Sequence, residues 1–210
     1  MTGYQPESQS SNSLHASNPF STRAVRPGAI VYRFPSDDSL ESLLSRLSEN
    51  HWWGEIVGIH GSGKSTLIQT LREALPNAGK EVHQFTLSRG ERRLPTAAAD
   101  EMSHWDEQTQ VVVDGFEQLG WWQRRALKRI CRGRGCGLLI TAHKSFGFPP
   151  VFTATTSLGL TEQLVFALLP DHATNHISTA IIEEAFGRHA GNVREVFFDL
   201  YDRYEQHARS

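Results

Sequence analysis

The segment Gly58-Ile59-His60-Gly61-Ser62-Gly63-Lys64-Ser65-Thr66 decides how the rest of the chain is interpreted. It matches the phosphate-binding pattern of a glycine, four residues and then Gly-Lys-Ser. The β-branched apolar run before it, residues 55–57, predicts a buried strand. After it, apolar residues recur at helical spacing: Leu67, Ile68, Leu71 and Leu75. Strand, glycine loop and helix, in this order, form the context that the motif requires.

The positions of this loop have separate predicted tasks. Glycines let backbone N–H groups turn toward an anion, and the N-terminus of the following helix adds a positive field. Lys64 is expected to reach the β- and γ-phosphates, and the Ser65 hydroxyl to bind Mg²⁺. The residues expected to cradle the nucleotide are Gly58, His60, Gly61, Ser62, Gly63, Lys64, Ser65 and Thr66. The expected cofactors are ATP and Mg²⁺, with ATP preferred over GTP because the sequence lacks the guanine-reading string Asn/Thr-Lys-x-Asp.

Two further apolar runs end in polar residues and predict strands that reach the same site. Residues 110–113 lead to Asp114, which is expected to hold Mg²⁺ through its water shell; the alternative is an aspartate that caps the next segment. Glu117 is a candidate for orienting an attacking water, or else faces solvent. Residues 137–143 contain Thr141 and His143, which either sense the γ-phosphate or, in the case of His143, only cap the strand.

The rest of the chain divides into three predicted parts. Residues 1–24 are rich in Ser, Asn, Gln and Pro and predict a disordered tail. Residues 25–160 predict an α/β core, and residues 161–210 a purely helical unit whose first helix is capped by Thr161. Phe34, before the first strand, is either a floor for the adenine base or an ordinary packing residue.

A basic cluster, Arg124 to Arg132, lies on a predicted helix next to Trp121. It could follow a nucleic-acid backbone, but cations late in a helix also complement the helix dipole on a solvated face, and we favour the second interpretation. The net charge of −2 adds no general basic excess that would favour nucleic acid. The apolar face expected for this helix is Leu119, Trp122, Ala126, Leu127 and Ile130.

Cysteine content and hydropathy give the remaining expectations. Cys131 and Cys136 have no second cysteine pair beside them, so we expect free thiols and no zinc site. No apolar run approaches the roughly 20 residues of a membrane span. We therefore expect a cytoplasmic protein that does not bind membranes.

Together these motifs resemble the AAA+ ATPases and their signal-transduction relatives, the STAND NTPases. The resemblance covers residues 30–205 and rests on the glycine loop, the Val-Val-Val-Asp strand and the string Gly191-Asn192-Val193-Arg194-Glu195. That string is similar to the family's second sensor, whose arginine, here Arg194, reaches back to the nucleotide from a lid helix. Thr141 to His143 lie where the first sensor is found. Gly115 stands where many of these ATPases carry a glutamate, and no arginine finger lies between His143 and Phe152.

The resemblance implies an α/β P-loop NTPase, a three-layer sandwich with a parallel five-stranded sheet and a small C-terminal helical lid. It also implies Mg²⁺-dependent hydrolysis of ATP to ADP and phosphate, coupled to a conformational change. The implied catalytic residues are Lys64, Glu117, Arg194, His143 and Thr141. One alternative is a nucleotide-dependent switch or adaptor with little turnover, which acts by binding a protein partner. The other is a small-molecule phosphotransferase.

Overall fold

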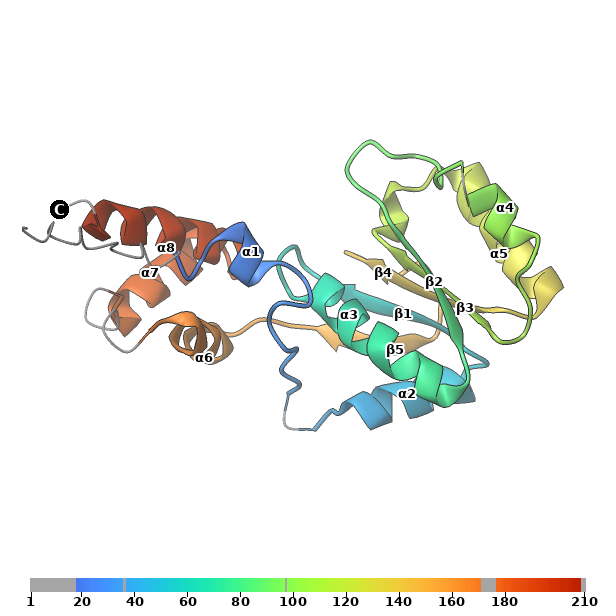
Figure 1. The fold of residues 1–210 in the computed structure, drawn as a ribbon, viewed down its shortest axis with the longest axis horizontal. Helices are drawn as coiled ribbons and strands as arrows, with labels where there is room; N and C mark the ends of the chain where they lie inside the picture. The colour runs from blue at the N-terminus through green and yellow to red at the C-terminus, as the bar shows by residue number, and fades with distance from the viewer. Residues whose placement is uncertain (1–17, 36, 97, 171–176, 209–210) are drawn as a thin grey trace, which may run out of the picture.

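The structure is a computed structural model that describes residues 18–35, 37–96, 98–170 and 177–208. It contains an α/β lobe and a lobe of helices (Figure 1). In the α/β lobe, all paired strands run parallel, and the order across the sheet is β2-β3-β4-β1-β5. The strands are β1 (Trp53–Gly58), β2 (Glu81–Thr86), β3 (Thr109–Asp114), β4 (Gly137–Ala142) and β5 (Pro150–Ala154). The predicted α/β class with a five-stranded parallel sheet is confirmed.

Helices pack on both faces of the sheet because its central strands are buried on both sides. Side chains alternate along β3: Val111 and Val113 belong to one core, and Val112 to the other. The Val112 core includes α2 (Leu40–Glu49) and α3 (Lys64–Ala74), and the opposite core includes α4 (Ala98–Met102) and α5 (Trp121–Arg134). Short 3₁₀ turns follow α3 and β3, at Leu75–Ala78 and Phe116–Gln118. The arrangement is compatible with a three-layer sandwich.

The helical lobe has a separate hydrophobic core. Its helices are α6 (Leu158–Leu168), α7 (Thr179–Arg188) and α8 (Val193–Ala208). The predicted cap of the first of them is wrong: the Ser157 side chain accepts from the Leu160 N–H, and Thr161 lies buried inside α6. The helical unit therefore begins at Leu158 rather than at residue 161.

Residues 18–24, predicted as part of a disordered tail, are folded onto the helical lobe. Phe20 is fully buried and stacks on Phe197 with ring centroids 6.2 Å apart. The side-chain amide of Asn18 donates to the carbonyl of Tyr201, and α1 (Thr22–Val25) follows. One large aromatic group supplies enough buried apolar area to hold a polar segment, which average composition does not reveal. The remainder of the predicted tail, residues 1–17, lies outside the described residues.

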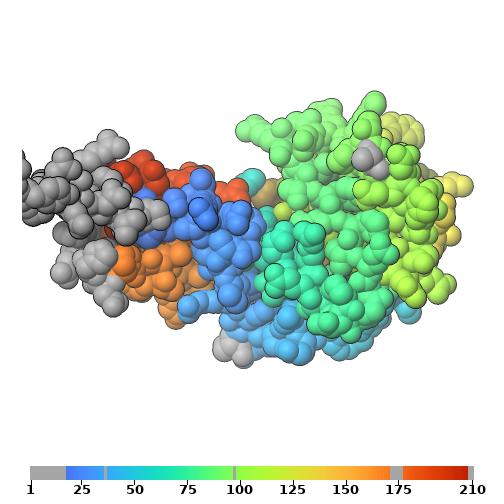
Figure 2. Space-filling view, viewed as in Figure 1, coloured from blue at the N-terminus to red at the C-terminus, as the bar shows by residue number. Residues whose placement is uncertain are grey.

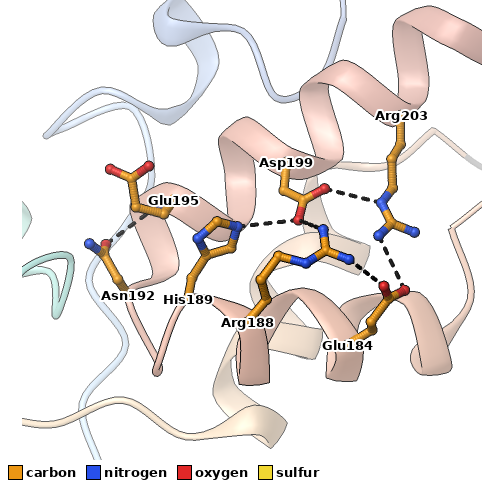
Figure 3. Close-up of polar contacts among 7 residues, drawn as sticks. All are labelled: Glu184, Arg188, His189, Asn192, Glu195, Asp199 and Arg203. Carbon is orange, nitrogen blue, oxygen red and sulfur yellow. Dashed lines mark hydrogen bonds and ion pairs between the residues drawn. The ribbon is translucent and has the colours of Figure 1, made fainter.

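An ion-pair network joins α7 to α8 (Figure 3). Asp199 is at its centre and accepts from Arg188, His189 and Arg203. Both arginines also pair with Glu184 on α7. Burial alone would raise the pKa of Asp199, but the hydrogen bonds and charges of its partners outweigh this effect and lower it.

The apolar face predicted for α5 is partly wrong. Leu127 and Cys131 are buried, whereas Trp122 and Ala126 are exposed. The aromatic rings beside the helix are instead covered by cations spaced four residues apart: Arg124 lies over Phe146, Lys128 over Phe148 and Arg132 over Trp53. Long basic side chains can cover apolar surface while their charges stay near water, so a helical stripe need not be apolar to pack.

Cys131 and Cys136 are free thiols, as predicted, and the structure buries both. Phe34 packs edge-to-face on Tyr32 and Phe152, which supports ordinary packing over a role beneath a base. No helix in the described ranges is both long and apolar enough to cross a bilayer.

Candidate functional site

The candidate site lies where the carboxyl ends of three neighbouring strands meet. The glycine loop follows β1, Asp114 ends β3, and Thr141 and His143 lie at the end of β4, which is hydrogen-bonded between the other two strands. All of these line one cavity of about 1170 Å³, together with Arg194 at the start of α8. The segment after α1 also lines the cavity and lies between the two lobes (Figure 2). Parallel strands put their carboxyl ends at one edge, so residues far apart in the chain converge there.

The glycine loop turns sharply because two of its glycines adopt left-handed backbone conformations. Gly61 has φ of 70° and Gly63 has φ of 84°. Gly63 precedes α3, and no side chain caps that helix, so the first N–H groups of α3 are not used by a cap. A concave turn of this kind at a helix N-terminus favours an anion.

Lys64 lies folded back into the loop. Its Nζ donates to the carbonyl oxygens of Gly58 and Ile59, at 2.7 Å in both cases, and the residue is buried. Burial lowers the pKa of Lys64, and the carboxylates of Asp114 and Glu117 oppose that shift. The ammonium group is thus partly desolvated beside two acids, where an added anion would interact with it strongly.

Asp114, Thr141 and Gly115 form a short chain of hydrogen bonds. The Thr141 hydroxyl donates to Asp114 Oδ1 at 2.5 Å and accepts from the Gly115 N–H at 3.0 Å. Asp114 is held in one rotamer at the rim of the cavity, which Ser65 also lines. No group of three or more His, Cys, Asp or Glu residues suited to a metal occurs among the described residues. One hydroxyl and one carboxylate nevertheless fit Mg²⁺, because this ion usually takes few protein ligands and binds substrate phosphates.

Glu117 faces the site rather than solvent. Its Oε1 lies 3.0 Å from Nε2 of His143, and its Oε2 is buried without a hydrogen-bond partner. Nδ1 of His143 lies 3.1 Å from the Gly58 carbonyl oxygen. His143 therefore connects Glu117 to the base of the glycine loop, and the predicted alternative of a solvent-facing carboxylate does not hold.

Two features distinguish this region from ordinary packing. The ring of His60 lies against that of His143, tilted by 41° with the centroids 3.6 Å apart, and burial, followed by the charges of His143 and Lys64, lowers the pKa of His60. Ser62 Oγ is buried without a partner, as is Glu117 Oε2. Buried polar atoms without partners are uncommon, and here both border the same cavity, where a polar ligand or water would satisfy them.

Arg194 reaches the site from the helical lobe. It is exposed at the start of α8, and its charge contributes to lowering the pKa values of Lys64 and His60. Asn192, just before it, accepts from the Glu195 N–H with its side-chain oxygen and so caps the helix (Figure 3). Of the residues predicted for the site, all but Gly58 line this cavity; the Gly58 carbonyl oxygen instead accepts from Lys64 Nζ within the loop.

Sequence reasoning missed Tyr32 as part of the cavity lining. Tyr32 lines the cavity, and a Cβ on Gly63 would lie 3.1 Å from its ring. Burial raises the pKa of Tyr32 to about 12, with a contribution from Asp38. An aromatic residue in a segment without regular secondary structure carries no local signal of this contact.

Comparisons with protein-family models and with curated proteins found no match to this chain.

Proposed function

We propose that this chain is an AAA+-like P-loop ATPase that binds ATP with Mg²⁺ between the α/β lobe and the helical lobe. One observation carries the proposal: the glycine loop, the buried Lys64 and the Asp114–Thr141 pair converge on a single cavity that Arg194 also lines. The cavity lies at the carboxyl edge of a parallel sheet, next to β1, whose neighbours β4 and β5 both come later in the chain. In open α/β sheets, ligands bind outside the carboxyl ends of the strands.

The residues have separate roles in this proposal. The loop amides and Lys64 bind the phosphates, and Lys64 exchanges its two carbonyl acceptors for phosphate oxygens. Ser65 and Asp114 would hold Mg²⁺, which neutralises charge on the phosphates when it is bound. Thr141 fixes the carboxylate of Asp114. The free Oε2 of Glu117 is placed to accept a hydrogen bond from a water in the cavity and thereby orient it.

His143 and Arg194 have supporting roles. His143 holds Glu117 Oε1 and so fixes the orientation of the Glu117 carboxylate. Arg194 contacts phosphate oxygens from the helical lobe, because a guanidinium binds such oxygens with paired hydrogen bonds. Adenine is the preferred base, as the sequence predicts.

Nucleotide binding is tested by calorimetry with Lys64→Ala and with Lys144→Ala as the control. Lys144 is exposed and does not line the cavity. We expect the wild type and the Lys144 variant to bind ATP with Mg²⁺ and the Lys64 variant to lose binding. Equal affinity in all three proteins would overturn the assignment of the loop.

A nucleotide-dependent switch is the second candidate, and the close approach of the two lobes favours it. A Cβ on Gly61 would lie 1.9 Å from Asn192 Oδ1, so a nucleotide that shifts the loop must also shift the helical lobe. Glu117→Gln separates the two functions. If the chain is a hydrolase, steady-state phosphate release falls about 100-fold or more, as for loss of a general base, while ATP affinity is retained. An unchanged rate would remove the catalytic role of Glu117 and leave the switch.

A further inference from the structure

The two most exposed tryptophans of the described residues lie side by side at the start of α5. Trp121 is 60% exposed and Trp122 is 75% exposed, and their rings pack edge-to-face with the ring centroids 4.4 Å apart. Large aromatic side chains are usually buried, and exposed ones mark binding surfaces when they cluster. Both residues lie outside the lining of the nucleotide cavity.

The cations around these tryptophans are not used by the fold. Three basic residues of α5 cover aromatic rings, as described above, but Arg125 and Arg129 point to solvent on the side of the tryptophans. Arg125 lies 5.8 Å from the Trp121 ring centroid. Within the described ranges, neither residue forms an ion pair. The basic cluster seen in the sequence therefore separates into a packing stripe and an exposed stripe.

A second segment adds charge to the same surface. The loop after β2 is held against the start of α5, where the Gly120 N–H donates to the Arg92 carbonyl oxygen at 3.0 Å. Arg92 and Arg93 are exposed on this loop. The nearby acid, Glu91, is also exposed, and its carboxylate accepts from the Ser88 N–H of the same loop. We call the combined surface the tryptophan patch; it consists of Arg92, Arg93, Trp121, Trp122, Arg125 and Arg129.

The N-terminus of α5 lies within the patch. Gly120 provides no side-chain cap, and the first turn has no acidic residue. The first N–H groups of a helix carry partial positive charge, and an anion would satisfy them. The patch thus combines flat aromatic faces with cations and uncapped amides.

We propose that the tryptophan patch binds a single-stranded polynucleotide. Bases stack on Trp121 and Trp122, while the arginines and the start of α5 contact the phosphates. A purely acidic partner would use the cations but would leave two indole faces without a role. A base-paired duplex would not present its base faces to them. Because the patch is separate from the cavity, the inference does not depend on ATP binding.

The test uses fluorescence anisotropy of labelled oligo(dT) and oligo(U) of about 20 nucleotides, with a duplex of equal length for comparison. We expect the single strands to bind more tightly than the duplex. The logarithm of the binding constant should fall with the logarithm of salt concentration, with a slope of about −0.7 for each phosphate contacted. The two oligonucleotides then show whether DNA or RNA is preferred.

Variants assign the binding to the patch. The double variant Trp121→Ala with Trp122→Ala should lose at least about tenfold in affinity, and Trp122→Phe should keep most of it, since a smaller ring still stacks. Arg125→Ala should reduce the salt slope by about 0.7. Phe166→Ala and Arg72→Ala, which change an exposed aromatic residue and an exposed cation elsewhere, are the controls and should bind as the wild type does.

Three results would overturn the proposal. One is that the folded wild-type chain does not bind the oligonucleotides. Another is that the tryptophan double variant binds them as tightly as the wild type does. The third is that poly-glutamate binds in competition with oligo(dT), and that Arg125→Ala loses this binding while the tryptophan variant keeps it. Such a result would identify a docking surface for an acidic protein. Circular dichroism and the urea midpoint of every variant establish that it is folded. Unchanged ATP binding in the variants would keep this test separate from that of the nucleotide site.

Discussion

Gly61 of the glycine loop lies directly against Asn192, the residue that caps α8, so that a Cβ on Gly61 would be 1.9 Å from Asn192 Oδ1. The Arg194 N–H group is also close, at 3.1 Å from that position. The two lobes therefore touch at the residue pair that joins the glycine loop to the helix of Arg194. The contact leaves no room for a side chain on Gly61.

The first prediction concerns this contact. Gly61→Ala should lower both the free energy of unfolding and ATP affinity, because it forces the lobes apart as well as imposing a left-handed alanine. Gly79→Ala is the matched control: its φ of 76° is similar, but nothing lies within 4 Å of the added Cβ. Backbone strain should cost both variants about 1–2 kcal/mol in urea unfolding. Only Gly61→Ala should lose more unfolding free energy than this and bind ATP more weakly. Equal stability and equal ATP affinity of the two variants would mean that the contact between the lobes is unimportant.

The second prediction concerns the hydroxyl of Thr141. Thr141→Val removes the donor to Asp114 and leaves the Gly115 N–H without its acceptor. The free energy of unfolding should fall by about 1–3 kcal/mol, and the Mg²⁺ dependence of ATP binding should weaken because Asp114 is no longer fixed. Thr153→Val, at an exposed position of β5, should change neither quantity. Chemical denaturation and calorimetry at several Mg²⁺ concentrations measure both effects, and a fully stable Thr141 variant would contradict the expectation.

The third prediction concerns Arg194. Arg194→Ala should weaken ATP more than ADP, since a guanidinium from α8 would contact the terminal phosphate most strongly. Glu183→Ala, at an exposed position of α7 outside the cavity lining, serves as the control and should leave the ratio of the two affinities unchanged. Titration of both nucleotides into each protein gives the ratio. Equal losses for ATP and ADP would show that Arg194 does not distinguish them.

The fourth prediction concerns pH and the helical lobe. The folded-state pKa of Asp199 lies below its ordinary value of about 3.9, so its network stabilises the fold above that pH. The contribution is lost as the pH falls through the lowered pKa. Asp199→Asn should thus destabilise the chain at pH 7 and have a smaller effect near pH 3. Asp202→Asn, at an exposed position of the same helix, should have little effect at either pH; urea midpoints at the two pH values decide the matter.

The sequence alone predicted the strands of the sheet and the helices of the helical lobe in their order along the chain. The runs at residues 56–57, 111–113 and 137–142 consist of apolar or β-branched residues, and such runs form strands buried on both faces of a sheet. The glycine loop between Gly58 and Thr66 was also predicted from the sequence, since its glycines and lysine have a fixed spacing. The family resemblance also implied that Arg194 lies on a helix, as it does in α8.

Only the tertiary structure decided which side chains meet. The parallel order β3-β4-β1 brings Asp114, Thr141 and Lys64 to one cavity, and no local pattern specifies that order. Packing likewise buried Phe20 in a polar segment and left Trp122 exposed on a helix where periodicity predicted it to be inside. Local periodicity shows which residues share a face, whereas burial depends on what packs against that face. Phe197 packs against Phe20, and the side chains of three basic residues of α5 cover the aromatic rings beside that helix.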